Sequence, residues 1–314
     1  MRLLVVLALL TALGACDVAG ERDALADSRP PPGIAPRFLP PDGWAWGVAQ
    51  PDAMPQVRYG VSAPPGRRAE AHLVIVPSAM EPAEAWFETI RTLNAQGFAV
   101  WVVERPGFGG SGRHVRPHDL AHSPSVEAEA LALNAVLTRI VAPAAEAPLV
   151  LLASADAAPA ALLASRGGAP VVDIIVSGRA PPPPSASAPP WALRLGLGRL
   201  PSADWRPWTR EHRPVPEGDP WRTKAAAAWP LANPDLRIGG ASIALRSRSA
   251  GTSAANLELT PLGLASDAAT CPSCDQLAIR GAGPSPHLDP DETREAWLTA
   301  LTARLAKARA TTPP

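Results

Sequence analysis

The stretch Pro148–Ala160, PLVLLASADAAPA, holds the pattern that decides the fold class. Its first five residues form an apolar run of strand length, and its last residues are rich in alanine, which favours a helix. Between these two parts, Ser154 lies where the chain must turn. The stretch therefore predicts a buried strand, a sharp turn and a helix, which is the unit of a protein built from alternating strands and helices.

The same alternation continues on both sides of this stretch, from residue 72 to residue 177. Apolar runs of strand length recur, with amphipathic helical patterns between them. Ser123 is a favourable N-cap for one of these helices, with Pro124 at the first helical position. The alternation predicts an α/β fold, a mostly parallel sheet with helices on both faces. The predicted elements include the strands His72–Pro77, Phe98–Val103, Leu149–Leu152 and Val171–Val176 and the helix Glu84–Gln96.

The alternation breaks at residues 180–240, which are rich in proline, tryptophan and arginine and contain no clear strand. We expect this segment to be a cap inserted over the carboxyl edge of the sheet, where ligands bind in folds of this class. The core is then expected to comprise residues 38–179 and 241–310. Its last part is predicted to contain the strands Leu259–Ala265 and Gln276–Arg280 and a final helix that starts near Pro290.

The first residues have the pattern of a bacterial lipoprotein signal peptide. Arg2 supplies a positive charge, Leu3–Leu10 is an apolar run too short to span a bilayer as a mature helix, and Leu13–Cys16 (LGAC) matches a lipobox. Cys16 is therefore expected to carry the lipid anchor. Residues 1–16 are the predicted signal segment and residues 17–37 the predicted tether, on the periplasmic side of the cell envelope. Asp17 slightly favours the inner membrane.

Composition and motifs exclude several other classes. The chain of 314 residues has 29 basic and 29 acidic side chains, so its formal net charge of zero gives no reason to expect nucleic acid. No cofactor is expected, because no phosphate-binding loop is found. His114, His118 and His122 are flanked by prolines and are not expected to bind a metal. In an exported protein, Cys271 and Cys274 favour a local disulfide.

Three stretches, in the right order, resemble the α/β-hydrolases, and most closely the lysophospholipase and monoacylglycerol-lipase-like branch of serine aminopeptidase type. Residues 97–113, GFAVWVVERPGFGGSGR, are similar to the family loop D-x-[RP]-G-x-G-x-S, with Glu104 in place of Asp. Residues 219–240, DPWRTKAAAAWPLANPDLRIGG, resemble the cap of that branch, and residues 279–297, IRGAGPSPHLDPDETREAW, resemble its last strand and helix. The resemblance implies an α/β-hydrolase fold and a lipid or acyl ester as ligand.

The catalytic positions of the family are substituted. The chemistry needs a nucleophile on a strained turn, a base, an acid that orients the base, and an oxyanion hole. Aligned from Leu151, the family pattern L-L-G-H-S-M-G-G places Ala155 at the nucleophile and alanines at the elbow glycines, and the family histidine falls on Pro284. Shifting the pattern by one residue makes Ser154 the nucleophile, but its flanks are then Leu152 and Asp156 in place of glycines, and the carboxylate would oppose a developing oxyanion. In the oxyanion loop, Ser78 replaces a glycine while Glu81 is kept.

These departures leave two interpretations open. Because nucleophile, base and elbow glycines are lost together, we expect a catalytically degenerate protein that binds a lipid or acyl ligand or an envelope partner. The alternative is an active serine esterase or lysophospholipase with a rearranged triad. In that triad Ser154 would attack an acyl ester, His287 would move its proton and Asp267 would orient His287. A solvated loop histidine and a turn-capping aspartate would explain the last two residues without catalysis.

Overall fold

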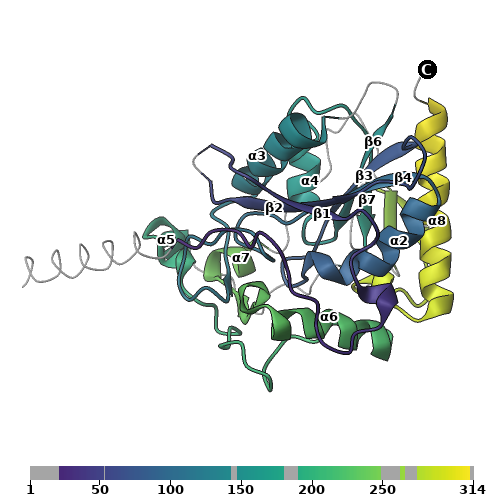
Figure 1. The fold of residues 1–314 in the computed structure, drawn as a ribbon. Helices are drawn as coiled ribbons and strands as arrows, with labels where there is room; N and C mark the ends of the chain where they lie inside the picture. The colour runs from purple at the N-terminus through teal and green to yellow at the C-terminus, as the bar shows by residue number, and fades with distance from the viewer. Residues whose placement is uncertain are drawn as a thin grey trace, which may run out of the picture.

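An eight-stranded sheet forms the centre of the computed structural model, which describes residues 21–52, 54–142, 147–179, 190–248, 262–265 and 274–311 (Figure 1). Its strand order is β1-β2-β4-β3-β6-β7-β9-β10. The six strands from β4 to β10 in this order run parallel, whereas β1 and β2 are antiparallel to their neighbours. The α/β fold is thus confirmed. The strands are β1 Ala45–Ala49, β2 Val57–Ser62, β3 Ala71–Val76, β4 Phe98–Val103, β6 Leu149–Ser154, β7 Val171–Ser177, β9 Leu262–Ala265 and β10 Asp275–Ala278.

Helices cover both faces of this sheet. On one face, α3 (Val126–Val136) and α4 (Ala158–Ala164) pack on the strands, and on the other lie α2 (Phe87–Ala95) and α8 (Asp291–Thr311) (Figure 1). The final helix begins one residue after Pro290, as predicted, and it buries Trp297, Leu301 and Leu305 completely. Their spacing of four places them on one side of the helix, so their burial joins α8 to the sheet.

The antiparallel strands β1 and β2 were not predicted from the sequence. Each contains a glycine, which weakens a strand pattern. The structure supplies the reason for both glycines, because a Cβ atom at Gly47 would lie 2.3 Å from the Tyr59 ring and one at Gly60 would lie 1.9 Å from the Trp44 ring. Aromatic side chains thus fill the space above the two glycines and hold this edge of the sheet together.

The N-terminus of α3 differs from the prediction. Ser125, not Ser123, is the N-cap: its backbone is extended, and its Oγ accepts a hydrogen bond from the Ala128 N–H over 3.1 Å. Ser123 Oγ instead donates to the Ser125 carbonyl. The helix therefore starts at Val126, because the serine that can reach a free N–H of the first turn is the one directly before it.

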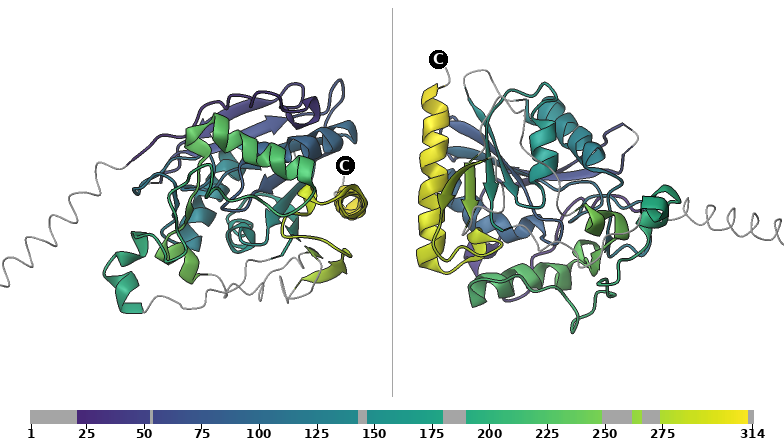
Figure 2. Two further views of the ribbon diagram at one scale, coloured as in Figure 1. Left: turned by 90° about the horizontal axis from the view of Figure 1, so that it is seen from below. Right: turned by 180° about the vertical axis from the view of Figure 1, so that it is seen from behind.

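The segment from residue 190 to residue 248 forms the cap, which lies along one edge of the core (Figures 1 and 2). It contains α5 (Pro190–Arg194), α6 (Pro220–Ala232), α7 (Ile243–Ser247) and β8 (Gly240–Ala241), which pairs with β5 (Leu120–Ala121). The Ile243 N–H bonds to the Leu200 carbonyl, so α7 is joined to the residues that precede α6. None of the helices in the described residues is long and apolar enough to cross a membrane.

Residues 21–37, expected to form part of a tether, are held against the core. Arg22 and Arg113 exchange backbone hydrogen bonds of 2.8 Å, and Arg22 also forms an ion pair with Asp235 of the cap. Further along, the Asn233 side chain bonds to the backbone of Arg29. The predicted signal segment and Cys16 lie outside the described residues.

Candidate functional site

The turn between β6 and α4 has no strained residue. β6 ends at Ser154, α4 begins at Ala158, and the Ala157 N–H closes the turn on the Ser154 carbonyl over 2.8 Å. Among the described residues, Ala142 is the one non-glycine residue with a positive φ, so every residue of this turn has a negative φ. A nucleophile elbow raises its residue on a strained backbone. This turn lies between a strand and a helix, as an elbow does, but its backbone φ angles are not strained.

The carboxylate of Asp156 binds the backbone donor that an oxyanion hole would use. Its Oδ2 accepts a hydrogen bond of 2.9 Å from the Ala79 N–H, in the loop that follows β3. In enzymes with a nucleophile elbow, the oxyanion is bound by one N–H from this loop and by the N–H of the residue after the nucleophile. With Ala155 at the nucleophile position, that second residue is Asp156. The Ala79 N–H is therefore already hydrogen-bonded to a carboxylate of the same chain.

Arg105 holds this carboxylate in place. Its Nη2 lies 2.8 Å from Asp156 Oδ2, and its Nη1 donates to Glu129 Oε2 over 2.8 Å. The second Glu129 oxygen pairs with Arg248 of the cap at 3.0 Å. Burial alone would lower the pKa of Arg105, but Glu129 and Asp156 outweigh this effect and raise the pKa above its ordinary value. The guanidinium is therefore a permanent cation that binds both carboxylates.

The ring of His287, the candidate base, is packed into the core, while the His287 carbonyl accepts a hydrogen bond from Arg294 Nε over 3.2 Å. It lies in the short helix Pro286–Leu288, its side chain is 1% exposed, and its ring stacks on Trp86 with 3.6 Å between the ring centroids. Nε2 lies 2.9 Å from Glu81 Oε1, but neither ring nitrogen has a partner in hydrogen-bonding geometry. Glu81 uses its other oxygen to accept from Trp86 Nε1. His287 is thus not hydrogen-bonded to Ser154, which is itself buried at the end of β6.

The other predicted site residues can be placed only in part. Asp267 and Cys271 lie outside the described residues. Cys274 is buried just before β10 and is disulfide-bonded, and its pairing with Cys271 stays a prediction. Pro284, at the position of the family histidine, brings its carbonyl against Gly178, where a Cβ atom would lie 2.0 Å from it. The chain after β7 and the loop before His287 are therefore in direct contact.

The glycine-rich loop after β4 is a structural turn around Glu104. Glu104 Oε1 accepts from the Ala83 N–H at 2.9 Å and Oε2 from the Gly110 N–H at 2.8 Å, and Arg58 forms an ion pair with the same carboxylate. Gly109 has a φ of +50° and lies so close that a Cβ atom there would meet Glu104 Oε1 at 2.2 Å. The glycines of this loop let the backbone close around a buried carboxylate, so no cofactor is needed to explain them.

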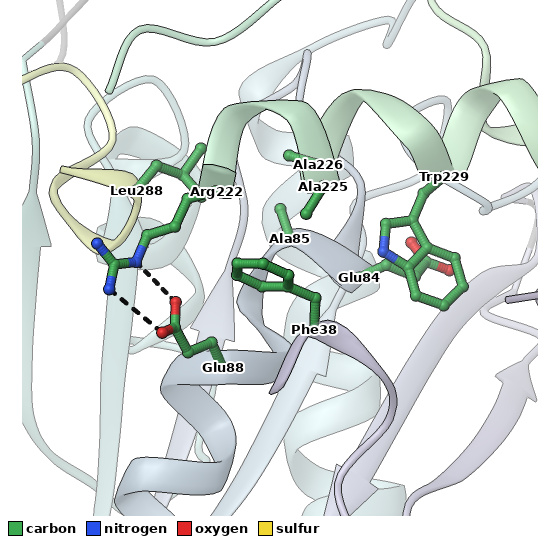
Figure 3. A pocket seen from close by; sticks show the side chains of 9 residues that line it. All are labelled: Phe38, Glu84, Ala85, Glu88, Arg222, Ala225, Ala226, Trp229 and Leu288. Atoms are coloured by element: carbon green, nitrogen blue, oxygen red, sulfur yellow. Dashed lines mark hydrogen bonds and ion pairs between the residues drawn. The ribbon is translucent and has the colours of Figure 1, made fainter. Parts of the chain in front are cut away.

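A small cavity lies between α6 of the cap and α2 of the core (Figure 3). Its volume is about 10 Å³, which is room for roughly one water molecule. Arg222 of α6 closes one side through hydrogen bonds of 2.7 and 3.2 Å to the two oxygens of Glu88. An acyl chain does not fit in this cavity. The lining residues are Phe38, Glu84, Ala85, Glu88, Arg222, Ala225, Ala226, Trp229 and Leu288.

Comparison with known proteins shows the fold of the chain. No protein-family model and no curated protein matches the sequence. Among solved structures, a soluble variant of monoglyceride lipase from Saccharomyces cerevisiae has a TM-score of 0.59 at 13% identity and covers 83% of this chain and 94% of its own. A carboxyl esterase from Bacillus coagulans has a TM-score of 0.58 at 13% identity, covering 85% of this chain and 99% of its own. A bromoperoxidase from Bacillus anthracis has a TM-score of 0.51 at 11% identity, covering 84% and 100%.

The chain has the α/β-hydrolase fold. The resemblance seen in the sequence is confirmed at this level, and on that fold the turn after β6 lies where the nucleophile is carried. Sequence reasoning identified Asp156 as unfavourable beside a nucleophile. It missed the two partners of Asp156, the Ala79 N–H and Arg105, because they lie 77 and 51 residues away along the chain. The one sequence signal for such an ion pair was Arg105, which directly follows Glu104.

Proposed function

We propose that this chain is a lipid-anchored protein of the bacterial envelope in which the α/β-hydrolase fold no longer performs serine-hydrolase chemistry and serves as a binding scaffold. The observation that carries the proposal is the hydrogen bond from the Ala79 N–H to the Asp156 carboxylate, with Ala155 at the nucleophile position. The ligand class we favour is an envelope partner or a lipid or acyl compound.

The chemical argument concerns the charge that forms during acyl transfer. A tetrahedral intermediate carries an oxyanion, and an oxyanion hole stabilises that charge with preorganised N–H groups. Here the carboxylate of Asp156 already holds one such group, and its own negative charge would repel a second anion. The relaxed turn adds one obstacle, and the burial of His287 against Trp86 and Glu81, away from Ser154, adds another. Catalysis would need at least three rearrangements together.

The architecture around the lost site supports a scaffold role. Buried ion pairs such as Arg105–Glu129 and Arg58–Glu84 are intact, and the cap is joined to the core through Arg222. The cavity beneath α6 has room for roughly one water, so the proposed ligand would bind elsewhere on the molecule. The anchoring part of the proposal rests on the lipobox Leu13–Cys16, and it predicts that lipid incorporation is lost in Cys16→Ala.

A fluorophosphonate probe tests the loss of catalysis. We expect no labelling of the wild-type protein and p-nitrophenyl ester turnover equal to that of Ser154→Ala. An unrelated active esterase in the same assay serves as the positive control for the probe. Labelling that disappears in Ser154→Ala would overturn the proposal and favour the alternative esterase with Ser154, His287 and Asp267; the variants His287→Ala and Asp267→Asn would then have to lose turnover as well.

A further inference from the structure

We infer that residues 190–200 of the cap, hereafter the docking segment, form a surface that rests on an anionic lipid membrane. The segment reads PWALRLGLGRL. Trp191 and Leu195 expose 61% and 70% of their surface, and three further leucines are exposed beside them. Exposed apolar side chains that gather in one place mark a contact surface rather than ordinary surface variation. The additional leucines are Leu193, Leu197 and Leu200.

The docking segment packs against α7 on one side and exposes these side chains. The Leu195 N–H bonds to the Trp191 carbonyl, and Leu200 bonds through its carbonyl to the Ile243 N–H of α7. Gly198 is buried on the inner side, where a Cβ atom would lie 3.0 Å from that of Ala244. A glycine at this point lets the segment lie close to α7. The inner side is therefore packed and the outer side presents the large apolar groups.

The charge of the docking segment suits an anionic surface. Its two charged residues, Arg194 and Arg199, are both basic and both exposed, and the segment contains no acidic residue. Arginine beside tryptophan and leucine is typical of protein segments that lie in the lipid interface. Each basic group near such a surface is attracted by the negative charge of the lipid headgroups. In a symmetric dimer through this segment, the arginines of one copy would face those of the other, and their repulsion disfavours that arrangement.

The position of the docking segment agrees with the predicted anchor. In the three views, α5 and the first described residues lie at the same end of the molecule (Figures 1 and 2). Four residues lie between Cys16 and Glu21, and the five steps from Cα to Cα can span at most about 18 Å. A membrane that holds a lipid on Cys16 is therefore within reach of the same end. The inference is independent of whether the protein hydrolyses esters.

Vesicle binding of the unlipidated chain that starts at Asp17 tests this inference, since that chain contains every described element. We expect it to bind vesicles of phosphatidylethanolamine and phosphatidylglycerol and to bind phosphatidylcholine vesicles more weakly. The double variant Trp191→Ser, Leu195→Ser should lower binding at least about tenfold, because two large apolar contacts are removed. Hydrogen exchange should slow in residues 190–200 when vesicles are added.

The matched control is Leu131→Ser on α3, whose leucine is equally exposed, at 69%, and lies outside the cap. Binding of this variant should equal that of the wild-type chain, and circular dichroism confirms that both variants are folded. Equal loss of binding in both variants, or no binding of the wild-type chain, would overturn the inference. So would a concentration-dependent dimer in the absence of lipid that Trp191→Ser, Leu195→Ser abolishes, since the segment would then be a protein interface.

Discussion

At the scale of single residues, Asp156 shows how one side chain after β6 can join the loops that follow two neighbouring strands. The carboxylate binds a backbone N–H and a buried guanidinium, and both contacts come from other strand ends. Neither contact requires glycine at the elbow positions where the family pattern has it and this chain has alanine. With an acidic side chain at position 156, the turn after β6 is stabilised by the hydrogen bond from the Ala79 N–H and by the ion pair with Arg105.

This arrangement predicts that Asp156→Ala destabilises the protein. The change leaves the Ala79 N–H unpaired and removes one of the two carboxylates that bind Arg105, which is 3% exposed. We expect the free energy of unfolding in urea to fall by roughly 3 kcal/mol, as for other broken buried ion pairs. Asp156→Asn, which keeps an acceptor oxygen, should cost less.

The control for this prediction is Asp235→Ala, which removes the partner of Arg22 in a more exposed ion pair. Its effect should stay within about 1 kcal/mol. If Asp156→Ala were as mild as Asp235→Ala, the carboxylate would not be holding the loop after β3, and the argument for a blocked oxyanion donor would lose its main support.

At the scale of elements, helix starts depend on which side chain reaches the first free N–H. The pair Ser123 and Pro124 looks like a helix start in the sequence, yet α3 begins at Val126 with Ser125 as its cap. The two serines differ in what they contact, since Ser123 Oγ donates to the Ser125 carbonyl. Element boundaries of this kind follow from local geometry that composition does not reveal.

Substitution of the cap tests this assignment. Ser125→Ala should lower the free energy of unfolding by about 1 kcal/mol, because the Ala128 N–H loses its acceptor. Ser125→Asp supplies another acceptor at the same place and should retain most of the stability. Thermal unfolding followed by circular dichroism measures both changes. Equal losses in the two variants would indicate that the hydroxyl itself, and not helix capping, is what matters.

At the scale of the whole molecule, one arginine joins three parts of the fold. Arg222 of α6 bonds to both oxygens of Glu88 on α2, to the Asp289 carbonyl and to Asp291 of α8. Burial would lower the pKa of Arg222, but its hydrogen bonds to Glu88 and Asp291 outweigh that effect and raise the pKa. The cap is thus fastened to both helices of one face of the sheet.

Loss of this junction should loosen the cap. Arg222→Leu leaves Glu88 without its main cation, and we expect the free energy of unfolding to fall by roughly 3 kcal/mol and proteolysis of the cap to accelerate. A double-mutant cycle with Glu88→Gln should show coupling between the two positions. The control is Arg309→Leu. Arg309 lies on α8 and forms an exposed ion pair with Glu70, so its loss should leave cap proteolysis unchanged. Additive effects of Arg222→Leu and Glu88→Gln would contradict the junction.

Sequence reasoning recovered the elements whose residues pack locally. The apolar run Phe98–Val103 is a strand with those bounds, and the final helix starts next to Pro290 as predicted. It missed β1 and β2, since their glycines make sense only beneath the rings of Tyr59 and Trp44. The assignment of the nucleophile and base positions to Ala155 and Pro284 stays a prediction, which rests on short continuous motifs.

The sequence by itself determined the α/β alternation, since periodicity is a property of neighbouring residues. The inserted cap and the substitutions at Ala155 and Pro284 stay predictions from composition and motif spacing. Only the tertiary structure decided what the altered site contains. The Ala79 N–H, Arg105 and Asp156 follow three different strands, and they meet because β4, β3 and β6 lie side by side and parallel, with their carboxyl ends at one edge. That edge is where a hydrolase would bind its oxyanion, and here the chain binds its own carboxylate there.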